Sequence, residues 1–554
     1  MKSKKRKKTY AYLAIVVLLV SVVYGAGIWI SRVEQPIDYD EEALIVDTEA
    51  ASNVSNPSAT LNGNLRHMRR IDEANVSFRW REYDFGEEDP EDWNETDSQK
   101  IQFDETRRFN TTITEDDGLE NNTLYEYKTV AINETEERKI EVTGARTYFI
   151  TQDLENVTET GDGTKENPYC IVNITGLQSI INEPGAYYKL CEDIDAKETE
   201  FWDEGRGFLP IGDDTVKFHG NFDGNGHNIT NLHINRPYLS NTALFGHIGF
   251  EESRDEDTRI ENVNLRNVTI EGDRGVGALV GRTTGSENTI IQNSSVYNGS
   301  VSGSGAVGGL VGSHNSFRET PGGRDNPEIR RSFANVTVND ISENGGDKFG
   351  GLVGFSQKGN VIDSYALGNV YAENAERVGG LAGCVDWRGE IRNSYSTGYV
   401  EGGEKVGGLV GNTEGQGQNA GRVIDSYWDT ETSEKEDSAG GEGLTTDEMI
   451  GTEAKDNMDG FDFDDIWETV DEDHDNAVED GYPILQAINR TIQLRAQDVL
   501  DENPVTAHQR SLEMNDNLNN LDLYEGTEDE DISIKLIRPL ISLEKFLMVR
   551  KSNI

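Results

Sequence analysis

Four acidic residues near the C-terminal end of the chain have the spacing of a calcium-binding loop. Asp471, Asp473 and Asp475 occupy positions 1, 3 and 5 of such a loop, and Asp480 offers a further oxygen. Calcium takes roughly six to eight oxygen ligands, and an EF-hand-like loop supplies a bidentate glutamate at position 12. Tyr482 stands at that position, so the sequence predicts weak calcium binding. The alternative, favoured by the acidity of the whole chain, is a solvated acidic loop.

Acidic and histidine side chains that would serve catalysis do not form a recognisable group. Glycoside cleavage needs carboxylates that converge on one face. The candidates are Asp193, Asp195, Asp213, Asp214, Asp223 and His219. The residues around them match no catalytic motif, and the histidine spacings match no metal-ligand pattern. The sequence therefore predicts no catalytic residue and no cofactor other than the candidate calcium ion.

The chain is strongly acidic along its whole length. Of 554 residues, 102 are Asp or Glu and 51 are Lys or Arg, which gives a formal net charge of -51. Charge of this sign repels nucleic acid, so no nucleic-acid partner is expected. The acid is dispersed and not gathered in one block, so it is not an acidic interaction tail. A surface adapted to high salt explains it better than a polyanion-mimic function, because dispersed charge carries no positional information.

The first thirty residues break this pattern. A basic segment, 1–9, precedes residues 10–30, which carry no charge and are long enough to cross about 30 Å of hydrocarbon. The basic flank predicts a cytoplasmic N-terminus, with the chain outside the cell after a linker at 31–43. A retained anchor is favoured, and a cleaved signal peptide, with Val23 and Gly25 before the cut, is the alternative. The expected location is therefore the cell membrane, single-pass, with the bulk of the chain extracellular.

N-glycosylation signals agree with export. The Asn-x-Ser/Thr pattern predicts glycan acceptors in exported proteins. The candidates are Asn53, Asn75, Asn94, Asn110, Asn121, Asn133, Asn156, Asn173, Asn228, Asn267, Asn293, Asn298, Asn335 and Asn489. Residues 336–488 contain none. A segment without glycosylation signals would leave its surface free to contact a partner. The alternative is that the signals are clustered elsewhere by chance.

Three cysteines exclude a dense disulfide framework. Cys170 and Cys191 lie in or beside strand-like stretches, so they are candidates for one bridge between neighbouring strands in an oxidising compartment. Cys384 is then left over and is expected to pack inside the fold.

Residues 44–151 alternate between apolar and polar positions, with polar turns between the alternating segments. This pattern predicts antiparallel strands in a β-sandwich. Residues 119–131, Leu-Glu-Asn-Asn-Thr-Leu-Tyr-Glu-Tyr-Lys-Thr-Val-Ala, resemble the tyrosine-corner strand of fibronectin type III domains. The resemblance implies a spacer module in which Trp80 and Tyr125 are packing residues.

A phrase of glycine and aliphatic residues recurs through the middle of the chain. It starts at 276, 307, 349, 378 and 406, and reads Val-Gly-Gly-Leu-Val-Gly in two copies. A second phrase, which ends in serine and, in four of its five copies, Phe or Tyr, alternates with it. Each unit of about 30 residues is too small to bury its own apolar face. Stacking the units as coils of a parallel β-helix solves this problem.

Stacked coils place equivalent residues in ladders. The predicted inward ladder consists of Leu279, Leu310, Leu352, Leu381 and Leu409, and a second ladder consists of Phe333, Tyr365, Tyr395 and Tyr427. The glycines are expected to adopt positive φ and so to let the backbone turn tightly between faces.

The two phrases resemble the GLUG-motif repeats of bacterial and archaeal surface proteins, which include adhesin-like chains. Residues 218–232 resemble the entry coil of a right-handed parallel β-helix, and residues 427–433 and 481–485 resemble the usual closing segment. The resemblance implies entry coils at 160–240, repeats at 241–433 and a closing segment at 434–488. It implies an architecture more firmly than an activity.

The sequence thus predicts a mainly β protein: an N-terminal transmembrane helix, a β-sandwich, a right-handed parallel β-helix of ~30-residue coils, and an unassigned region at 489–554. The expected function is cell-surface binding or adhesion, without catalysis, to surface glycans or proteins. The alternatives are a carbohydrate-active β-helix enzyme, either polysaccharide lyase or hydrolase, and a structural envelope component. Carboxylates clustered beside a groove would favour the enzyme, and a flat face with dispersed carboxylates would favour the adhesin or the structural component.

Overall fold

The computed structural model describes residues 44–498 apart from a set of short internal segments. Those segments are 56, 69–70, 84–92, 103–106, 122, 135–138, 152–159, 250–256, 286–288, 317–325 and 472–480. The predicted basic segment, anchor and linker, together 1–43, lie outside the described residues, as does 499–554. Within the described residues, no helix is both long and apolar enough to cross a membrane.

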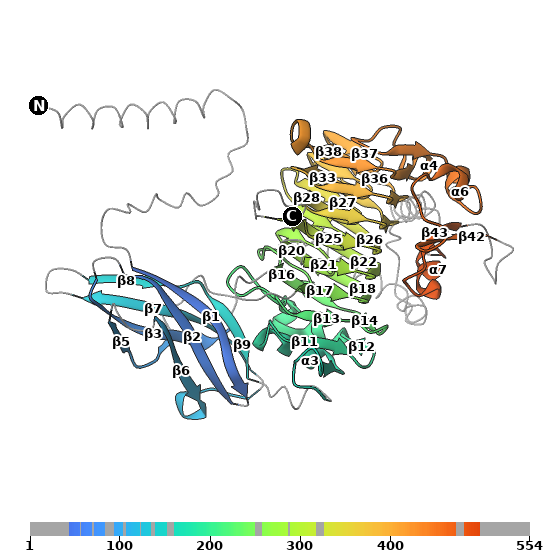
Figure 1. Ribbon diagram of the computed structural model, residues 1–554. Coiled ribbons are helices and arrows are strands. Elements are labelled where there is room, and N and C mark those ends of the chain that lie inside the picture. Colours follow the sequence, from blue (N-terminus) through green and yellow to red (C-terminus); the bar gives the residue numbers. More distant parts are fainter. Residues whose placement is uncertain are drawn as a thin grey trace, which may run out of the picture. The chain divides into compact units, whose positions relative to one another are not determined.

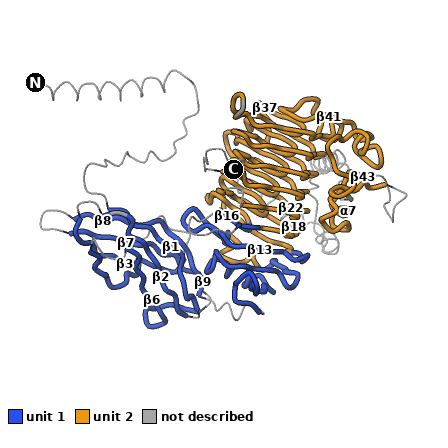
Figure 2. The backbone as a smooth tube through the Cα atoms, viewed as in Figure 1, with its two compact units in different colours: residues 1–198, 208–228, 244–259 blue, residues 199–207, 229–243, 260–554 orange. Residues whose placement is uncertain are grey.

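The chain divides into two compact units (Figure 2). Unit 1 consists of 1–198, 208–228 and 244–259, and unit 2 consists of 199–207, 229–243 and 260–554. The chain is mainly β and contains a parallel β-solenoid of about seven turns. The predicted class and the parallel stacking of coils are therefore confirmed.

Unit 1 begins with two antiparallel sheets that share one hydrophobic core. One sheet has the order β1-β2-β6, from β1 (Leu44–Ser55), β2 (Ser58–Met68) and β6 (Arg108–Thr114). The other has the order β4-β3-β7-β8, from β4 (Asn94–Glu95), β3 (Glu73–Glu82), β7 (Leu124–Glu134) and β8 (Lys139–Thr143). In the same sheet β5 (Gln99–Gln102) pairs with β3, and β9 (Thr147–Ile150) pairs with β7. A short 3-10 helix, η1 (Glu115–Asp117), follows β6. The rings of Trp80 and Tyr125 lie 5.7 Å apart in the core, and the Tyr125 hydroxyl accepts a hydrogen bond from the Glu120 amide at 2.7 Å. Both residues therefore pack, and the fibronectin type III resemblance stays a prediction.

The remaining strands of unit 1 are short. They are β10 (Tyr169–Ile171), β11 (Tyr187–Leu190), β12 (Ile194–Asp195), β13 (Asn221–Asp223) and β16 (Phe245–Gly249). Two short helices, α3 (Ile174–Ser179) and η2 (Ile180–Asn182), follow β10. Three elements cross the unit boundary: η3 (Lys197–Gly205), β14 (Asn228–Thr230) and β17 (Thr258–Glu261). The strands β10, β11 and β13 pair in parallel. Cys170, on β10, and Cys191, directly after β11, form a disulfide with Cα atoms 5.6 Å apart. Cys384 is free and fully buried.

Unit 2 stacks its strands in four parallel ladders (Figure 1). The first consists of β21 (Thr289–Gln292), β25 (Glu328–Arg330), β29 (Asn360–Ile362), β34 (Glu390–Arg392) and β39 (Arg422–Ile424). The second consists of β18 (Asn264–Glu271), β22 (Ser295–Gly303), β26 (Phe333–Asp340), β30 (Tyr365–Ala366), β35 (Tyr395–Ser396), β40 (Tyr427–Asp429) and β41 (Glu442–Leu444), joined by β15 (His233–Asn235), β31 (Val370–Ala372) and β36 (Val400–Gly402). The third consists of β20 (Val280–Thr284), β24 (Val311–Asn315), β28 (Val353–Gln357), β33 (Ala382–Asp386) and β38 (Val410–Thr413). The fourth consists of β19 (Arg274–Val276), β23 (Gly305–Gly308), β27 (Asp347–Gly350), β32 (Arg377–Gly379) and β37 (Lys405–Gly407). A short 3-10 helix, η4 (Gly417–Asn419), follows β38.

The glycine and leucine phrase forms a close backbone contact between coils. The Leu310 amide donates to the Leu352 carbonyl at 3.0 Å, and the same bond links each leucine of the predicted ladder to the next. All five leucines are fully buried. The phrase glycines do not have positive φ, so the expectation that they do is wrong. They are required because the coils approach closely: a Cβ on Gly351 would lie 2.2 Å from the Gly380 carbonyl oxygen.

Positive φ occurs instead at the residue before the serine of the second phrase. Asn293, Asp363 and Asn393 have φ near 50° (51°, 47° and 47°), a conformation that Asn and Asp tolerate better than other side chains. The serines that follow them are buried, and each links two coils. For example, Ser364 Oγ donates to the Ile362 carbonyl at 2.8 Å and accepts from the Ser332 amide at 3.2 Å. The second phrase is therefore a corner of the coil.

The aromatic ladder lies on the outer face of its sheet. A Cβ on Gly309 would lie 3.0 Å from the Ala334 Cβ, so Ala334 points into the coil and Phe333 beside it points out. Phe333, Tyr365 and Tyr395 stack with centroids 4.8 and 4.9 Å apart. The closing segment covers them. It consists of α4 (Thr430–Ser433), α5 (Thr446–Met449), α6 (Ala454–Asn457), β42 (Trp467–Val470), β43 (Gly481–Leu485) and α7 (Arg490–Asp498).

His314 is a buried histidine on β24. Its Nε2 lies 3.0 Å from the Pro327 carbonyl and its Nδ1 lies 3.2 Å from the Thr283 hydroxyl. Gly359 makes room for the ring, because a Cβ there would lie 2.1 Å from Cδ2. Burial lowers the pKa of His314 to about 4. The neutral imidazole is therefore the form that packs.

We predict that Gly351→Ala destabilises unit 2 by roughly 2 kcal/mol, because the new methyl group would overlap the Gly380 carbonyl. Gly305→Ala is the matched control, since a Cβ there would lie 3.3 Å from the nearest heavy atom, and it should cost less than about 1 kcal/mol. Urea denaturation followed by circular dichroism measures both. Equal midpoints for the two variants would contradict the close-approach explanation.

We predict that His314 makes unit 2 less stable as the pH falls from 6.5 towards 4. In the unfolded state His314 binds a proton near pH 6.5, and in the folded state only near pH 4. The contribution of neutral His314 to the free energy of unfolding is therefore complete above pH 6.5 and is lost as the pH falls towards 4. The loss should approach roughly 3 kcal/mol. His314→Gln should remove this part of the slope in unfolding free energy against pH. Identical slopes for wild type and variant would refute the assignment.

Candidate binding face on the solenoid

One outward face of unit 2 carries two rows of side chains in register. Its strands are β15, β18, β22, β26, β31 and β36, of which β18, β22, β26 and β36 are labelled in Figure 1. The first row is His233, Thr269, Ser300, Thr337, Asn369 and Tyr399, and the second row is Asn235, Glu271, Ser302, Asn339, Tyr371 and Glu401. We call these twelve residues the polar strip.

The strip faces outward because buried residues alternate with it. Ile270, Val301 and Val338 lie between the two rows and are at most 1% exposed. Neighbouring residues of a strand point to opposite faces, so both rows point away from the interior of the coil. None of the twelve residues is buried. Successive strands place equivalent side chains about 4.8 Å apart, and the two rows lie about 7 Å apart along each strand.

Two tyrosines form the aromatic end of the strip. The rings of Tyr371 and Tyr399 lie 5.8 Å apart at 44°. Asn369 supports both: its Nδ2 donates to the Tyr371 hydroxyl at 3.2 Å, and its Oδ1 accepts from the Tyr399 amide at 3.0 Å. Tyr371 is 36% exposed. Partial burial raises the pKa of both tyrosines, so their hydroxyls stay protonated at neutral pH.

The centre of the strip is uncharged. From β22 to β31 it offers Ser300, Ser302, Thr337, Asn339 and Asn369, together with the tyrosines. Hydroxyl and amide groups both donate and accept hydrogen bonds. The carboxylates Glu271 and Glu401 flank this centre in the second row, and Asn235 lies beyond Glu271.

Sequence reasoning missed the strip. Its only sequence signal is the alternation of buried valine with polar residues after each serine phrase, as in Val336-Thr337-Val338-Asn339. Residue type recurs at the inward valine positions and varies at the outward positions. The outward positions are therefore not recognised as part of the sequence repeat.

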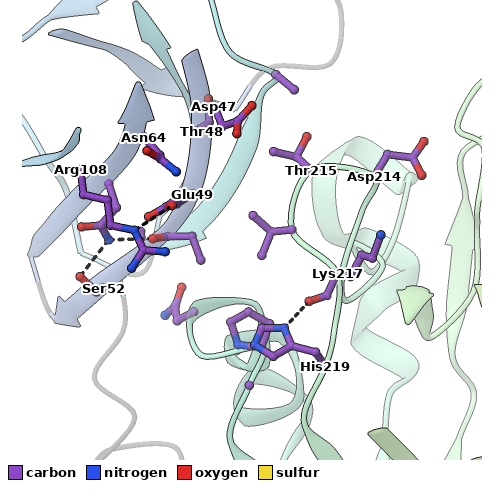
Figure 3. A pocket seen from close by; sticks show the side chains of 18 of the residues that line it. Asp47, Thr48, Glu49, Ser52, Asn64, Arg108, Asp214, Thr215, Lys217 and His219 are labelled. Atoms are coloured by element: carbon purple, nitrogen blue, oxygen red, sulfur yellow. Dashed lines mark hydrogen bonds and ion pairs between the residues drawn. The ribbon is translucent and has the colours of Figure 1, made fainter. Parts of the chain in front are cut away.

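Unit 1 contains a cavity of about 950 Å³ (Figure 3). Side chains of both charge signs line it, and several pair with each other: Arg66 with Asp47, and Arg108 with Glu49 at 3.4 Å. His219 Nδ1 lies 2.9 Å from the carbonyl oxygen of Lys217. Because these pairs already satisfy part of the charge that would hold a ligand, the cavity is a weaker candidate than the strip.

Most of the sequence-derived catalytic candidates use their carboxylates to hold the backbone, three of them in local turns. The carboxylates of Asp193, Asp195, Asp213 and Asp223 accept hydrogen bonds from the backbone amides of Asn228, Lys197, Thr215 and Asn225. Asp214 lies 2.8 Å from the Nδ1 of His247, and not beside His219. The structure therefore does not bring these six residues together.

The calcium candidates fall largely in a gap. Asp473, Asp475 and Asp480 lie outside the described residues, and only Asp471 is described. Within the described part of the chain, no group of three or more His, Cys, Asp or Glu side chains has the arrangement of a metal site.

One glycosylation candidate is buried. Asn335 is 7% exposed, and its Nδ2 donates to the Ala496 carbonyl of α7 at 2.6 Å, so the closing segment covers the acceptor atom. Asn156 lies outside the described residues. The other candidates are exposed or partly exposed, and Asn267 and Asn298 lie beside the strip residues Thr269 and Ser300.

Comparison with known proteins gives two partial relatives. No family model matches the chain. A stretch of 141 residues is 34% identical to halomucin of Haloquadratum walsbyi, covering 24% of this chain and 2% of halomucin. A stretch of 133 residues is 39% identical to a putative Gly-rich membrane protein of Evansella cellulosilytica, covering 23% of this chain and 14% of that protein. The chain thus spans a small part of either relative.

Among solved structures, two matches are structures of the sensor domain of the anti-sigma factor RsgI4 of Pseudobacteroides cellulosolvens, one of a short form of the domain and one determined in solution. They are 17% and 18% identical to this chain and cover 20% of it, and 94% and 77% of the respective sensor-domain chains. The TM-score is 0.16 for both, so these matches carry no inference about function.

Proposed function

We propose that this protein is a cell-surface binding protein, which adheres to a polymer of its own or a neighbouring cell surface through the polar strip. The observation that carries the proposal is the pair of in-register rows that ends at Tyr371 and Tyr399. The strip binds its partner and leaves it chemically unchanged.

The repeat of the strip suits a polymer. An outward side chain recurs in each row about every 4.8 Å, once per coil. A chain molecule that lies across the strands therefore meets a polar or aromatic side chain at each step, and weak contacts add along its length. A small ligand would use one step only.

The relatives support a surface location. One of them is named halomucin and the other a putative Gly-rich membrane protein. Together with the parallel solenoid, they support a surface- or membrane-associated repeat protein. We propose that residues 10–30 anchor the chain in the cell membrane, that the module at 44–151 is a fibronectin-like spacer, and that the coils are GLUG-type repeats. Calcium at 471–480 remains a proposed weak ligand.

We predict that the double variant Tyr371→Ala/Tyr399→Ala binds its polymer roughly 5- to 100-fold more weakly, because each ring contributes about 0.5–1.5 kcal/mol through its face. Co-sedimentation of the full-length protein with insoluble polysaccharides at molar salt measures the affinity. Trp387→Ala is the matched control, because that ring is 42% exposed on the same solenoid and lies off the strip.

The same assay tests the rival function. Release of shortened saccharides into the supernatant would replace the binding proposal by a polysaccharide lyase or hydrolase. Equal affinity of wild type and double variant would remove the strip from the binding site. Loss of binding in chelator would show that calcium takes part.

A further inference from the structure

Resting on the proposed function, we propose that the polar strip selects an uncharged polysaccharide chain, one sugar ring wide, over carboxylated or sulfated ones. The charge, the hydrogen-bonding groups and the aromatic pair of the strip favour this class of ligand.

The charge of the strip disfavours an acidic ligand. None of its twelve residues is Lys or Arg. An anionic sugar at the centre would lose water without gaining an opposite charge, and it would approach Glu271 and Glu401, which flank the centre in the second row. The ammonium of Lys435 lies 5.7 Å from the Tyr399 ring centre and donates to the Glu434 carbonyl, so it stands at the edge and not in the centre.

The polar groups of the centre match sugar hydroxyls. A sugar hydroxyl is both donor and acceptor, as are the side chains of Ser302, Thr337 and Asn339. Asn339 Nδ2 already donates to Ser302 Oγ at 3.2 Å, which holds both side chains in place across two coils. Such prepared groups lose little conformational freedom when a ligand binds.

The aromatic end offers a surface for a sugar ring. The face of an aromatic ring is electron-rich, and the C–H groups of a pyranose ring carry partial positive charge, so the two pack face to face. Tyr371 and Tyr399 are held by Asn369 and come from successive coils. Because the two rows lie about 7 Å apart, a single unbranched chain fills the width of the strip.

Matched polymers that differ only in charge test the inference. Biolayer interferometry with the full-length protein compares hydroxyethylcellulose with carboxymethylcellulose, and dextran with dextran sulfate, at molar and at lower salt. We expect the uncharged member of at least one pair to bind at least about tenfold more tightly, with little dependence on salt. Tyr371→Ala/Tyr399→Ala should abolish the preference, and Trp387→Ala should keep it.

A second variant moves the preference in the opposite direction. Ser302→Lys/Asn339→Lys adds two cations to the centre of the strip, and it should shift binding towards carboxymethylcellulose by about tenfold or more. A merely structural role of the strip would not produce this reversal. Circular dichroism spectra equal to that of the wild type establish that each variant is folded.

The outcomes separate this inference from the proposed function. If the wild type prefers the charged polymers and loses them in the tyrosine variant, the strip binds a polymer but its selectivity is opposite to the one inferred. If the tyrosine variant binds every polymer as the wild type does, or the wild type binds none, both the proposed function and the inference are overturned.

Discussion

The close contact between backbones at the glycine and leucine phrase sets the geometry of unit 2. The Leu352 amide donates to the Leu381 carbonyl at 3.0 Å, and a Cβ on Gly380 would lie 2.1 Å from the Gly408 carbonyl oxygen. Once the coils lie this close, the register of every other strand pair follows, because all strands of a coil move together. Ladders of leucine, serine and aromatic residues are consequences of this single contact.

The closing segment depends on those ladders. Stacked rings at Tyr365 and Tyr395 expose hydroxyl groups that need partners once they are buried. Gln493 Oε1 accepts from Tyr365 at 2.9 Å, and the Pro483 carbonyl accepts from Tyr395 at 2.7 Å. Asp429, fully buried, accepts hydrogen bonds from the hydroxyls of Thr446 and Tyr482, both at 2.7 Å. Specific hydrogen bonds therefore fix where the segment lies on the sheet, and apolar contact alone would leave it free to slide.

Sequence patterns predict the parts of this fold that repeat in phase. The leucine ladder is visible because one phrase recurs in every coil. The function of the phrase glycines cannot be predicted from the sequence. The distance between coils is a tertiary property, and the residues around Gly351 do not indicate it. Burial of Asn335 is hidden for the same reason: its partner Ala496 lies 161 residues away. A sequence motif defines only the residues within it and does not identify the partners that they contact elsewhere in the chain.

The strip escaped prediction because binding and folding use different positions of the same strands. Inward positions such as Val338 must fit a packed interior and so keep their type from coil to coil. Outward positions such as Asn339 and Tyr371 carry no such constraint, so their types vary and can be altered to change the ligand while the coil is kept. Catalysis needs groups gathered around one bond, whereas this face spreads its polar and aromatic groups at equal steps. That geometry favours recognition of a polymer along its length over reaction at one point of it.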